Sequence, residues 1–356
     1  MSFCRLLAFG LWCSLPGLWL RASAATILVT TNDTFAKIEM ARAGDTVLIA
    51  PGNYSYRVFL TQPGTAAAPI TIRALDLVHR PVWDFGDGLV EDAPGSHTAG
   101  YRGRGGWQFS GAQHYRVSGI VFRHCHNAEG NAGGVRYYNG TKNLYLAHCR
   151  FEENDNGLTG GSEDSEAVVA ACEFNANGNP HAVAPTHNLY IYGGELTLRS
   201  CYVHDSVQGE NFHLRCRRAV LEYNCFARAR NYEGDLMTDI DFTGAGPFTQ
   251  SLTLRGNVFV QNPAPVNHAQ LCAVANDSGR SHLTFTVRIR HNLFIGANVH
   301  SSLLHLVNRD GSRMRAEISG NLIGGVSRMV VSDDRAAAFI SGGHNWLPAG
   351  VDDVAR

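Results

Sequence analysis

The amino-acid sequence predicts an all-β solenoid, because one short strand motif recurs along most of the chain. An eight-residue pattern begins at Tyr115 and returns seven more times, with start-to-start spacings of 29, 23, 29, 23, 33, 35 and 29 residues. The sixth and eighth positions repeat the same residue types, as expected when equivalent residues of successive coils stack on one another. Glycine is abundant, with 38 residues, which fits a chain with many tight turns.

The two repeating columns predict what fills the solenoid. The sixth position holds, in order, Ile120, Cys149, Cys172, Cys201, Asn224, Asn257, Asn292 and Asn321. The eighth position holds Phe122, Phe151, Phe174, Val203, Phe226, Phe259, Phe294 and Ile323. We expect the phenylalanines to stack in the interior and the asparagines to form a hydrogen-bonded ladder. We expect the cysteines to be small buried ladder residues, and one strained disulfide between neighbouring rungs stays open as an alternative.

Each coil should carry a second strand after its turn. Strand alternation predicts inward-facing side chains at Val135, Leu158, Leu189, Ile191, Phe212, Leu214, Ile240 and Leu304. The alternate residues then face outward on parallel neighbouring strands: Arg136, Tyr138, Thr159, Tyr190, Tyr192, His213, Arg215, Asp239, Asp241 and His305.

The two ends of the chain differ from the repeats. Residues 1–24 are predicted to be a signal peptide, since Arg5 precedes an apolar run and Ala22-Ser23-Ala24 forms a small-residue cleavage site. We therefore expect a secreted or periplasmic protein of bacterial origin, with residues 25–356 as one domain whose register is clearest at 115–325. Residues 32–34 should cap a short helix that runs to about Arg42. The stretch 86–106 is predicted to be a loop that overhangs a groove.

Composition excludes several classes of protein. The formal net charge is −1, so the chain lacks the basic surface expected of a nucleic-acid-binding protein. No segment after the predicted signal peptide is apolar and long enough to cross a bilayer. A hydrophobic content of 44% fits a folded chain, and we expect a monomer.

The columns, the asparagine ladder and the opening ATILV…GDTVLIAPGNY resemble the right-handed parallel β-helix proteins of the pectate-lyase-like superfamily. The resemblance covers nearly the whole mature chain and implies a solenoid of about ten coils with a short N-terminal capping helix. The segment 187–246, which contains HNLYIYGG, ENFHLRCRR and TDIDF, resembles secreted bacterial β-helix proteins presumed to act on polysaccharides. The Asp-Pro-His motif of alginate epimerases, the ordered polygalacturonase motifs and a clear pectate-lyase calcium cluster are absent from the sequence.

The outward residues of three successive coils converge on one candidate site. β-Elimination of a uronate needs a cation for the carboxylate, a base for the α proton and an acid for the leaving oxygen. His213 is the candidate base and Arg215 the candidate carboxylate ligand. Tyr190 or Tyr192 would protonate the leaving oxygen or stack on a sugar ring. Asp239 and Asp241 would bind Ca²⁺ or orient the histidine and the arginine.

Other residues complete this prediction. Arg136, Tyr138, His187 and Asn188 are candidate substrate-binding residues, although His187 and Asn188 could instead only shape a turn. The longer insertions after the repeats at 219 and 252 could wall the same face. The favoured function is a lyase on an acidic polysaccharide. A C5-epimerase, a glycoside hydrolase, a non-catalytic glycan-binding protein and an ordinary solvated face with ion pairs stay open as alternatives.

Overall fold

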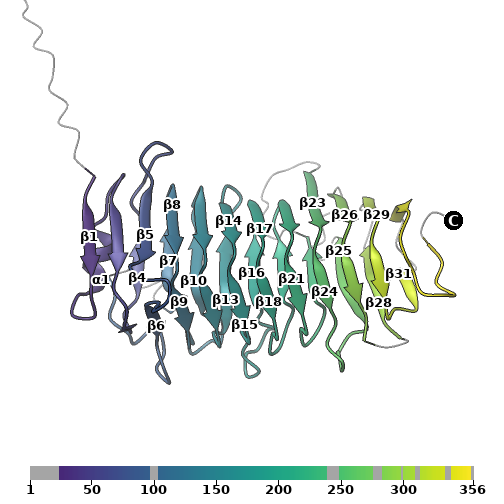
Figure 1. The fold of residues 1–356 in the computed structure, drawn as a ribbon, viewed down its shortest axis with the longest axis horizontal. Coiled ribbons are helices and arrows are strands. Elements are labelled where there is room, and N and C mark those ends of the chain that lie inside the picture. Colours follow the sequence, from purple (N-terminus) through teal and green to yellow (C-terminus); the bar gives the residue numbers. More distant parts are fainter. Residues whose placement is uncertain are drawn as a thin grey trace, which may run out of the picture.

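The computed structural model describes residues 24–96, 103–238, 248–275, 283–297, 300–308, 313–332 and 338–353. Their strands form three long parallel sheets that run the length of an elongated stack, as Figure 1 shows. Sheets of 12, 10 and 10 strands fit the predicted number of about ten coils. Each complete coil contributes one strand to each sheet in turn, so the chain is a right-handed parallel β-helix, as the sequence predicts.

We call the three sheets A, B and C in the order in which a coil visits them. Sheet A contains β1 (Thr26–Val29), β2 (Thr46–Ile49), β5 (Ile70–Ala74), β8 (Tyr115–Ser118), β11 (Leu144–Ala147), β14 (Glu166–Ala170), β17 (Glu195–Arg199), β20 (Arg218–Glu222), β23 (Phe248–Arg255), β26 (Leu283–Arg290), β29 (Arg313–Ser319) and β32 (Ala338–Gly343). Sheet B contains β3 (Asn53–Tyr54), β6 (Val82–Asp84), β9 (Val121–Arg123), β12 (Arg150–Glu152), β15 (Glu173–Asn175), β18 (Tyr202–His204), β21 (Cys225–Ala227), β24 (Val258–Val260), β27 (Leu293–Ile295) and β30 (Leu322–Gly324). Sheet C contains β4 (Val58–Leu60), β7 (Gly105–Ser110), β10 (Gly133–Tyr138), β13 (Asn156–Gly161), β16 (Leu189–Tyr192), β19 (Phe212–Arg215), β22 (Gly234–Met237), β25 (Ala269–Ala275), β28 (Ser302–Asn308) and β31 (Arg328–Ser332).

Each coil has three strands rather than the two that the sequence analysis expects. The eight-residue motif bends in its middle, so that its first half lies in sheet A and its second half in sheet B. The bend falls at the fifth position, where the backbone adopts a positive φ in every repeat: Gly119, His148, Ala171, Ser200, Tyr223, Gly256, His291 and Gly320. Only three of these eight residues are glycine, so composition alone does not mark the bend.

The phenylalanine column fills the interior as predicted. Phe151 and Phe174 stack with ring centroids 4.5 Å apart, and Phe259 and Phe294 stack at 4.6 Å. At the repeat where Val203 interrupts the column, Phe212 of sheet C instead packs edge-on against the next phenylalanine of the column. The core is therefore continuous along the described coils.

The asparagine ladder is also confirmed. The amide of Asn257 donates to Asn292 Oδ1 at 3.0 Å, and that of Asn224 donates to Asn257 Oδ1 at 3.0 Å. The cysteine rungs continue it, because the backbone N–H of Cys149 lies 3.4 Å from Cys172 Sγ. All seven described cysteines carry reduced thiols, so none of them supports the disulfide alternative.

The N-terminal end carries the predicted helix in a shorter form. Helix α1 (Phe35–Glu39) ends before Arg42, and its N-cap residue Thr34 makes no side-chain capping bond. Asp33 accepts hydrogen bonds from the backbone and hydroxyl of Thr30 instead. Residues 1–23 of the predicted signal peptide and residues 97–102 of the predicted loop lie outside the described residues.

Candidate functional site

The outer face of sheet C aligns the candidate residues of neighbouring coils. In the parallel register of β16 and β19, Tyr190 pairs with His213 and Tyr192 pairs with Arg215. Residues two apart on a strand share a face, so these four side chains lie in two adjacent rows. The structure thus brings together the four residues that the sequence analysis selects as catalytic candidates.

His213 lies between a carboxylate and a guanidinium. Its Nδ1 lies 2.8 Å from Oδ1 of Asp235, which is the register partner of His213 on β22. Its Nε2 accepts a hydrogen bond of 3.1 Å from Arg215 Nε, and another guanidinium nitrogen of Arg215 donates to the carbonyl of Thr238 at 3.0 Å. An arginine is always a donor, so Nε2 presents a lone pair and the proton resides on Nδ1, toward Asp235.

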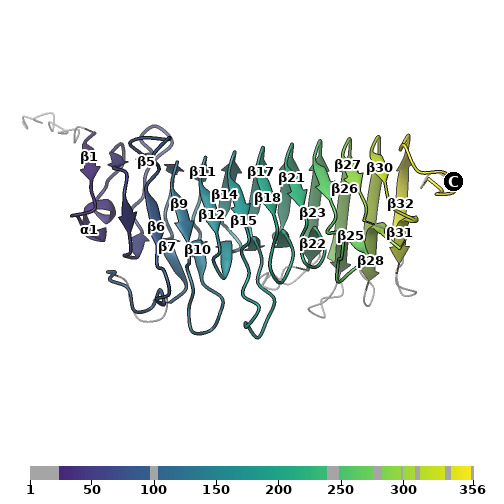
Figure 2. The same cartoon turned by 60° about the horizontal axis from the view of Figure 1, so that its bottom comes forward.

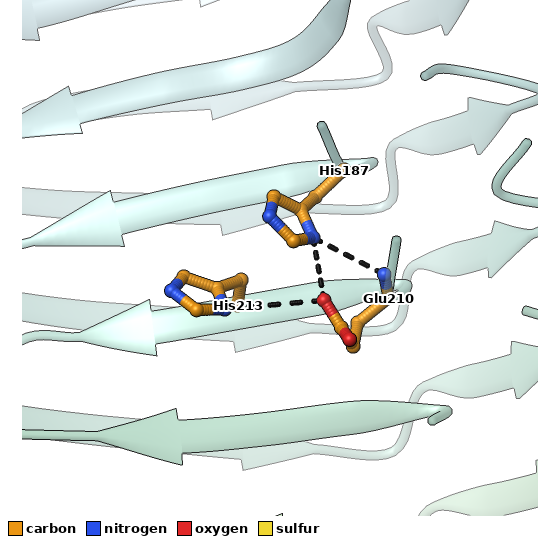
Figure 3. Close-up of side chains that lie close together, drawn as sticks. All are labelled: His187, Glu210 and His213. Atoms are coloured by element: carbon orange, nitrogen blue, oxygen red, sulfur yellow. Dashed lines mark hydrogen bonds and ion pairs between the residues drawn. The ribbon is translucent and has the colours of Figure 1, made fainter. Parts of the chain in front are cut away.

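A second histidine and a second carboxylate adjoin this group, as Figure 3 shows. His187 precedes β16, Glu210 precedes β19, and His187 Nδ1 lies 2.7 Å from Glu210 Oε2. The same carboxylate oxygen lies 3.9 Å from His213 Nδ1. The rings of His187 and His213 stack with centroids 4.6 Å apart. Three titratable side chains from two successive coils therefore meet at one point, and both His187 and Glu210 are more than nine-tenths buried.

The environment of Glu210 favours its ionised form. Burial alone would raise the pKa of this carboxyl, but the combined attraction of His187 and His213 and a hydrogen bond from Asn231 lower the pKa below its ordinary value. A buried, ionised carboxylate next to two imidazoles forms a centre that attracts a cation.

A pocket of about 620 Å³ lies beside the histidines over β10, β13 and β16. Tyr190, Tyr192 and Arg136 line its floor, and Arg104 lines it as well. Its walls are the loops that lead into β10 and β16, at 129–131 and 182–186. These two loops, blue and teal in Figure 2, project from the same edge of the stack. The pocket gives an extended ligand a place to lie across several coils.

Arginine and tyrosine side chains interact along the pocket floor. A terminal guanidinium nitrogen of Arg136 lies 3.4 Å from the hydroxyl of Tyr192. Nε of Arg136 is buried and has no hydrogen-bond partner among the described residues. The ring of Tyr190 lies 4.9 Å from that of His213. Of the two tyrosines, Tyr190 is thus the one beside the histidine, whereas Tyr192 points its hydroxyl toward Arg136.

Two predicted substrate-binding residues lie in places that do not fit that role. Asn188 is fully buried and belongs to a second interior ladder, in which it accepts from Asn177 and donates to Asn211. Tyr138 is only 4% exposed, its ring lies under the Arg136 guanidinium at 5.2 Å, and it does not line the pocket. Both side chains are therefore covered by neighbouring residues and do not face the pocket.

The next strand of sheet C after β19 begins earlier than the sequence analysis expects. β22 spans Gly234–Met237, and Leu236 rather than Ile240 pairs with the inward Leu214. Asp235 therefore lies beside His213, on the coil where the sequence analysis expects Asp239 and Asp241 to face the histidine and the arginine. Asp239 and Asp241 lie outside the described residues, as do 239–247 and 276–282 of the two longer insertions, so the calcium prediction and the predicted walls stay predictions.

Sequence reasoning missed Glu210 and Asp235. Glu210 lies in the turn before β19 and outside any alternating segment, so strand periodicity gives no signal for it. Asp235 was missed because the apolar alternation of LMTDIDF also fits a strand that starts two residues later. A segment aligned on Gly234 and Leu236 instead would have placed Asp235 in the row of Tyr190 and His213.

No protein-family model matches this chain, and no curated protein matches it. Solved structures do match. An alginate lyase from Paenibacillus sp. strain FPU-7 superposes with a TM-score of 0.61 at 14% identity, covering 91% of this chain and 99% of that one. The chain has the right-handed parallel β-helix fold. A protein of Geobacillus virus E2, ORF18, superposes with a TM-score of 0.55 at 12% identity, covering 89% of this β-helix chain and 61% of the viral one.

Pectate lyase Pel9A is also similar, with a TM-score of 0.46 and 12% identity over 93% of this chain and 79% of that one. At such identities the alginate lyase and the viral protein show the fold alone, and the activity has to be argued from the chemistry of the site. No helix in the described part of the chain combines the length and apolar character needed to cross a membrane.

Proposed function

We propose that this β-helix is a secreted, carbohydrate-active enzyme that cleaves an acidic polysaccharide by β-elimination. The observation that carries the proposal is the group formed by Asp235, His213 and Arg215, in which a carboxylate orients an imidazole whose other nitrogen faces a guanidinium. The predicted signal peptide supports secretion. Polysaccharide-cleaving enzymes among the proteins of similar fold support a glycan substrate.

In the proposed reaction, the substrate uronate first draws Arg215 away from His213. A carboxylate can accept two parallel hydrogen bonds from a guanidinium and so competes with a neutral imidazole nitrogen. His213 Nε2 then presents its lone pair to the proton on C5, which lies α to the uronate carboxylate. Asp235 stabilises the imidazolium that forms, since its carboxylate accepts a hydrogen bond from Nδ1–H.

Arg215 also stabilises the negative charge that develops on the uronate carboxylate as the C5 proton leaves. The electron pair of the C5–H bond forms the C4–C5 double bond, and the bond between C4 and the glycosidic oxygen breaks. Tyr190 protonates that leaving oxygen, because its ring lies beside His213. The products are an unsaturated uronate end and a new hydroxyl end, with all atoms conserved.

The pocket supports an acidic rather than a neutral glycan. Arg104, Glu129 and Arg136 line it, and Arg104 is already paired with Glu129 at 2.9 Å, so the argument rests on Arg136. The buried Nε of Arg136 is a donor without a described partner. Such a donor is costly unless an acceptor reaches it, and a sugar carboxylate or hydroxyl would serve. Tyr192 offers an aromatic surface for a sugar ring at the same place.

The site supports a lyase better than a glycoside hydrolase. Hydrolysis needs two carboxyl groups that face the scissile bond. Glu210 and Asp235 are each more than nine-tenths buried, and each contacts a histidine. A C5-epimerase would use the same proton abstraction but return a proton to C5, so the products distinguish it from a lyase.

The test is ultraviolet absorbance of the unsaturated product when mature protein is mixed with separate polyuronates and glycosaminoglycans. We expect a rise on one of these substrates. We expect His213→Ala to lower the rate by at least about 100-fold, since general-base catalysis typically contributes that much. Arg215→Lys should also lose rate, because lysine cannot bind a carboxylate bidentately.

His181→Ala serves as a control, since His181 is an exposed residue of the loop before β16. This variant should keep the rate of the unaltered protein. Full elimination activity in His213→Ala would overturn the proposed base. New reducing ends without any ultraviolet product would replace the lyase by a hydrolase, and proton exchange at C5 without cleavage would indicate the epimerase.

A further inference from the structure

We propose that His187, Glu210 and His213 form a binding site for a divalent transition-metal ion such as Zn²⁺, and that the bound ion withdraws His213 from proton transfer. The first part concerns only the three side chains. The second part rests on the proposed function, because it concerns the rate of the elimination. The site would make this β-helix a glycan-cleaving enzyme that transition metals inhibit.

The three side chains provide a suitable set of ligand atoms. Each offers one nitrogen or carboxylate oxygen, and these three atoms all lie within 4.8 Å of one another. Two imidazoles and one carboxylate are a ligand set that binds Zn²⁺ at about 2.0–2.2 Å per bond. Ca²⁺ prefers six to eight oxygen ligands, so this nitrogen-rich set does not fit calcium.

The contacts of His187 Nδ1 are better satisfied by a cation than by protons alone. This nitrogen lies 2.7 Å from Glu210 Oε2, and it also accepts from the backbone N–H of Glu210 at 3.1 Å. An imidazole nitrogen offers either one proton or one lone pair, so it cannot donate to the carboxylate and accept from the amide at once. A metal ion bound by both the nitrogen lone pair and the carboxylate oxygen would resolve the contact between these two atoms, and the amide N–H of Glu210 would then give up its bond to Nδ1.

The surroundings hold the ligands in place before any ion binds. The side-chain amide of Asn231 donates to Glu210, and the stacked rings of His187 and His213 lie 20° from parallel. A Cβ atom on Gly209 would collide with His187 Nδ1, so glycine is needed there for the imidazole to approach Glu210. Outer contacts that orient ligands in this way contribute strongly to metal affinity.

Metal binding would oppose the role of His213 as a base. An ion on Nδ1 of His213 displaces the proton that now forms the hydrogen bond to Asp235, and a neutral ring must then carry its proton on Nε2. A protonated Nε2 has no lone pair for the C5 proton of the substrate. It also faces the Nε–H of Arg215, which is 3.1 Å away, as donor against donor.

The first experiment is a calorimetric titration of chelator-treated mature protein with Zn²⁺, without any substrate. We expect one tight site per chain. His187→Ala and Glu210→Gln should each weaken it by at least about tenfold, the lower end of what altered metal sites lose. His181→Ala, which removes an exposed histidine outside the cluster, should bind like the unaltered protein. Equal affinity in all four proteins would overturn the proposed site.

Two further readouts keep the result interpretable. Co²⁺ added to the unaltered protein should give the strong visible absorption of a tetrahedral nitrogen–oxygen site, and a spectrum like that of hydrated Co²⁺ would contradict it. Zn²⁺ should suppress elimination and a chelator should restore it. If no substrate is ever cleaved, the proposed function fails while the titration still decides the metal site. If Zn²⁺ binds but the elimination rate is unchanged, the inhibition alone is wrong.

Discussion

At the scale of single residues, the properties of His213 depend on which nitrogen carries its proton. Asp235 accepts from Nδ1 and Arg215 donates to Nε2, so both neighbours select the same tautomer. We therefore regard Asp235 as a positioning residue, since it acts on the substrate through His213. Its carboxylate also stabilises the imidazolium that proton abstraction creates.

Asp235→Asn tests this role. The amide occupies the same space but lacks the charge, and it can turn its N–H toward Nδ1 and so favour the wrong tautomer. We expect kcat of the elimination to fall by about 100-fold or more, with KM little changed. The measurement is a kinetic series on the substrate found by ultraviolet screening, with the exposed Asp164→Asn as its control. A loss confined to KM would indicate that Asp235 binds substrate instead.

Single residues of the site were predictable to the extent that they lie in regular strands. Tyr190, Tyr192, His213 and Arg215 follow strict alternation in β16 and β19, so their common face could be read from the sequence. Glu210 lies in a turn, and turns between coils vary in length and path. Its contact with His187 depends on three-dimensional spacing that no local pattern records.

At the scale of elements, the second interior ladder connects the turns between sheets B and C. Asn154, Asn177, Asn188 and Asn211 bond in succession, and the side-chain amide of Asn211 donates to Glu233 at 2.7 Å. These asparagines are 23, 11 and 23 residues apart, because Asn177 and Asn188 lie at the two ends of one loop, between β15 and β16 of the same coil. For this reason a fixed repeat spacing, which predicts the first ladder, does not predict this one.

Glu233 gives this ladder a pH dependence. Burial raises the pKa of Glu233 from 4.5 to about 8, so the folded chain binds this proton more tightly than the unfolded chain. The contribution to stability is fully present below the unfolded pKa of 4.5 and is lost as the pH rises through about 8. We expect stability to decline by up to about 1.4 kcal/mol per pH unit in this window.

The measurement is the thermal midpoint of the unaltered protein and of Glu233→Gln across that window. Glutamine has no proton to lose, so the difference between the two midpoints should change steadily with pH in favour of the variant. The comparison removes the contribution of histidines, which titrate alike in both proteins. Parallel curves would show that the ionisation of Glu233 is not linked to unfolding.

At the scale of the whole molecule, the fold was the most predictable feature. A solenoid repeats one local structure, so each of the eight repeats gives independent evidence for the same columns. The exceptions to the phenylalanine column, Val203 and Ile323, therefore do not hide the register. The pocket could not be predicted in the same way. Its walls are loops of unique length and sequence, and their shape depends on packing against the coils rather than on the repeat.

The linear architecture also predicts how far a local loss of stability extends along the stack. Each coil contacts only its neighbours, so the loss of a terminal cap should loosen the nearest coils and leave distant ones intact. At the C-terminal end the first ladder ends on Asp353, whose carboxylate accepts from the backbone N–H of Asn345 at 3.2 Å and from its side-chain amide at 2.8 Å. Asn345 in turn accepts from Asn321.

Asp353→Ala should therefore speed amide hydrogen exchange in β30 and β32 while leaving β11 to β16 unchanged. The two Asn345 donors lose their acceptor, which should lower the stability by about 1–3 kcal/mol. This change should be confined to the last coils. The measurement is hydrogen exchange by mass spectrometry, with the exposed Asp87→Ala as the matched control. Faster exchange spread evenly over all coils would mean that the stack unfolds as one cooperative unit, and unchanged exchange in β32 would mean that Asp353 is not the cap. Because the candidate site lies on β16, β19 and β22, far from this end, elimination activity in Asp353→Ala should stay at the level of the unaltered protein.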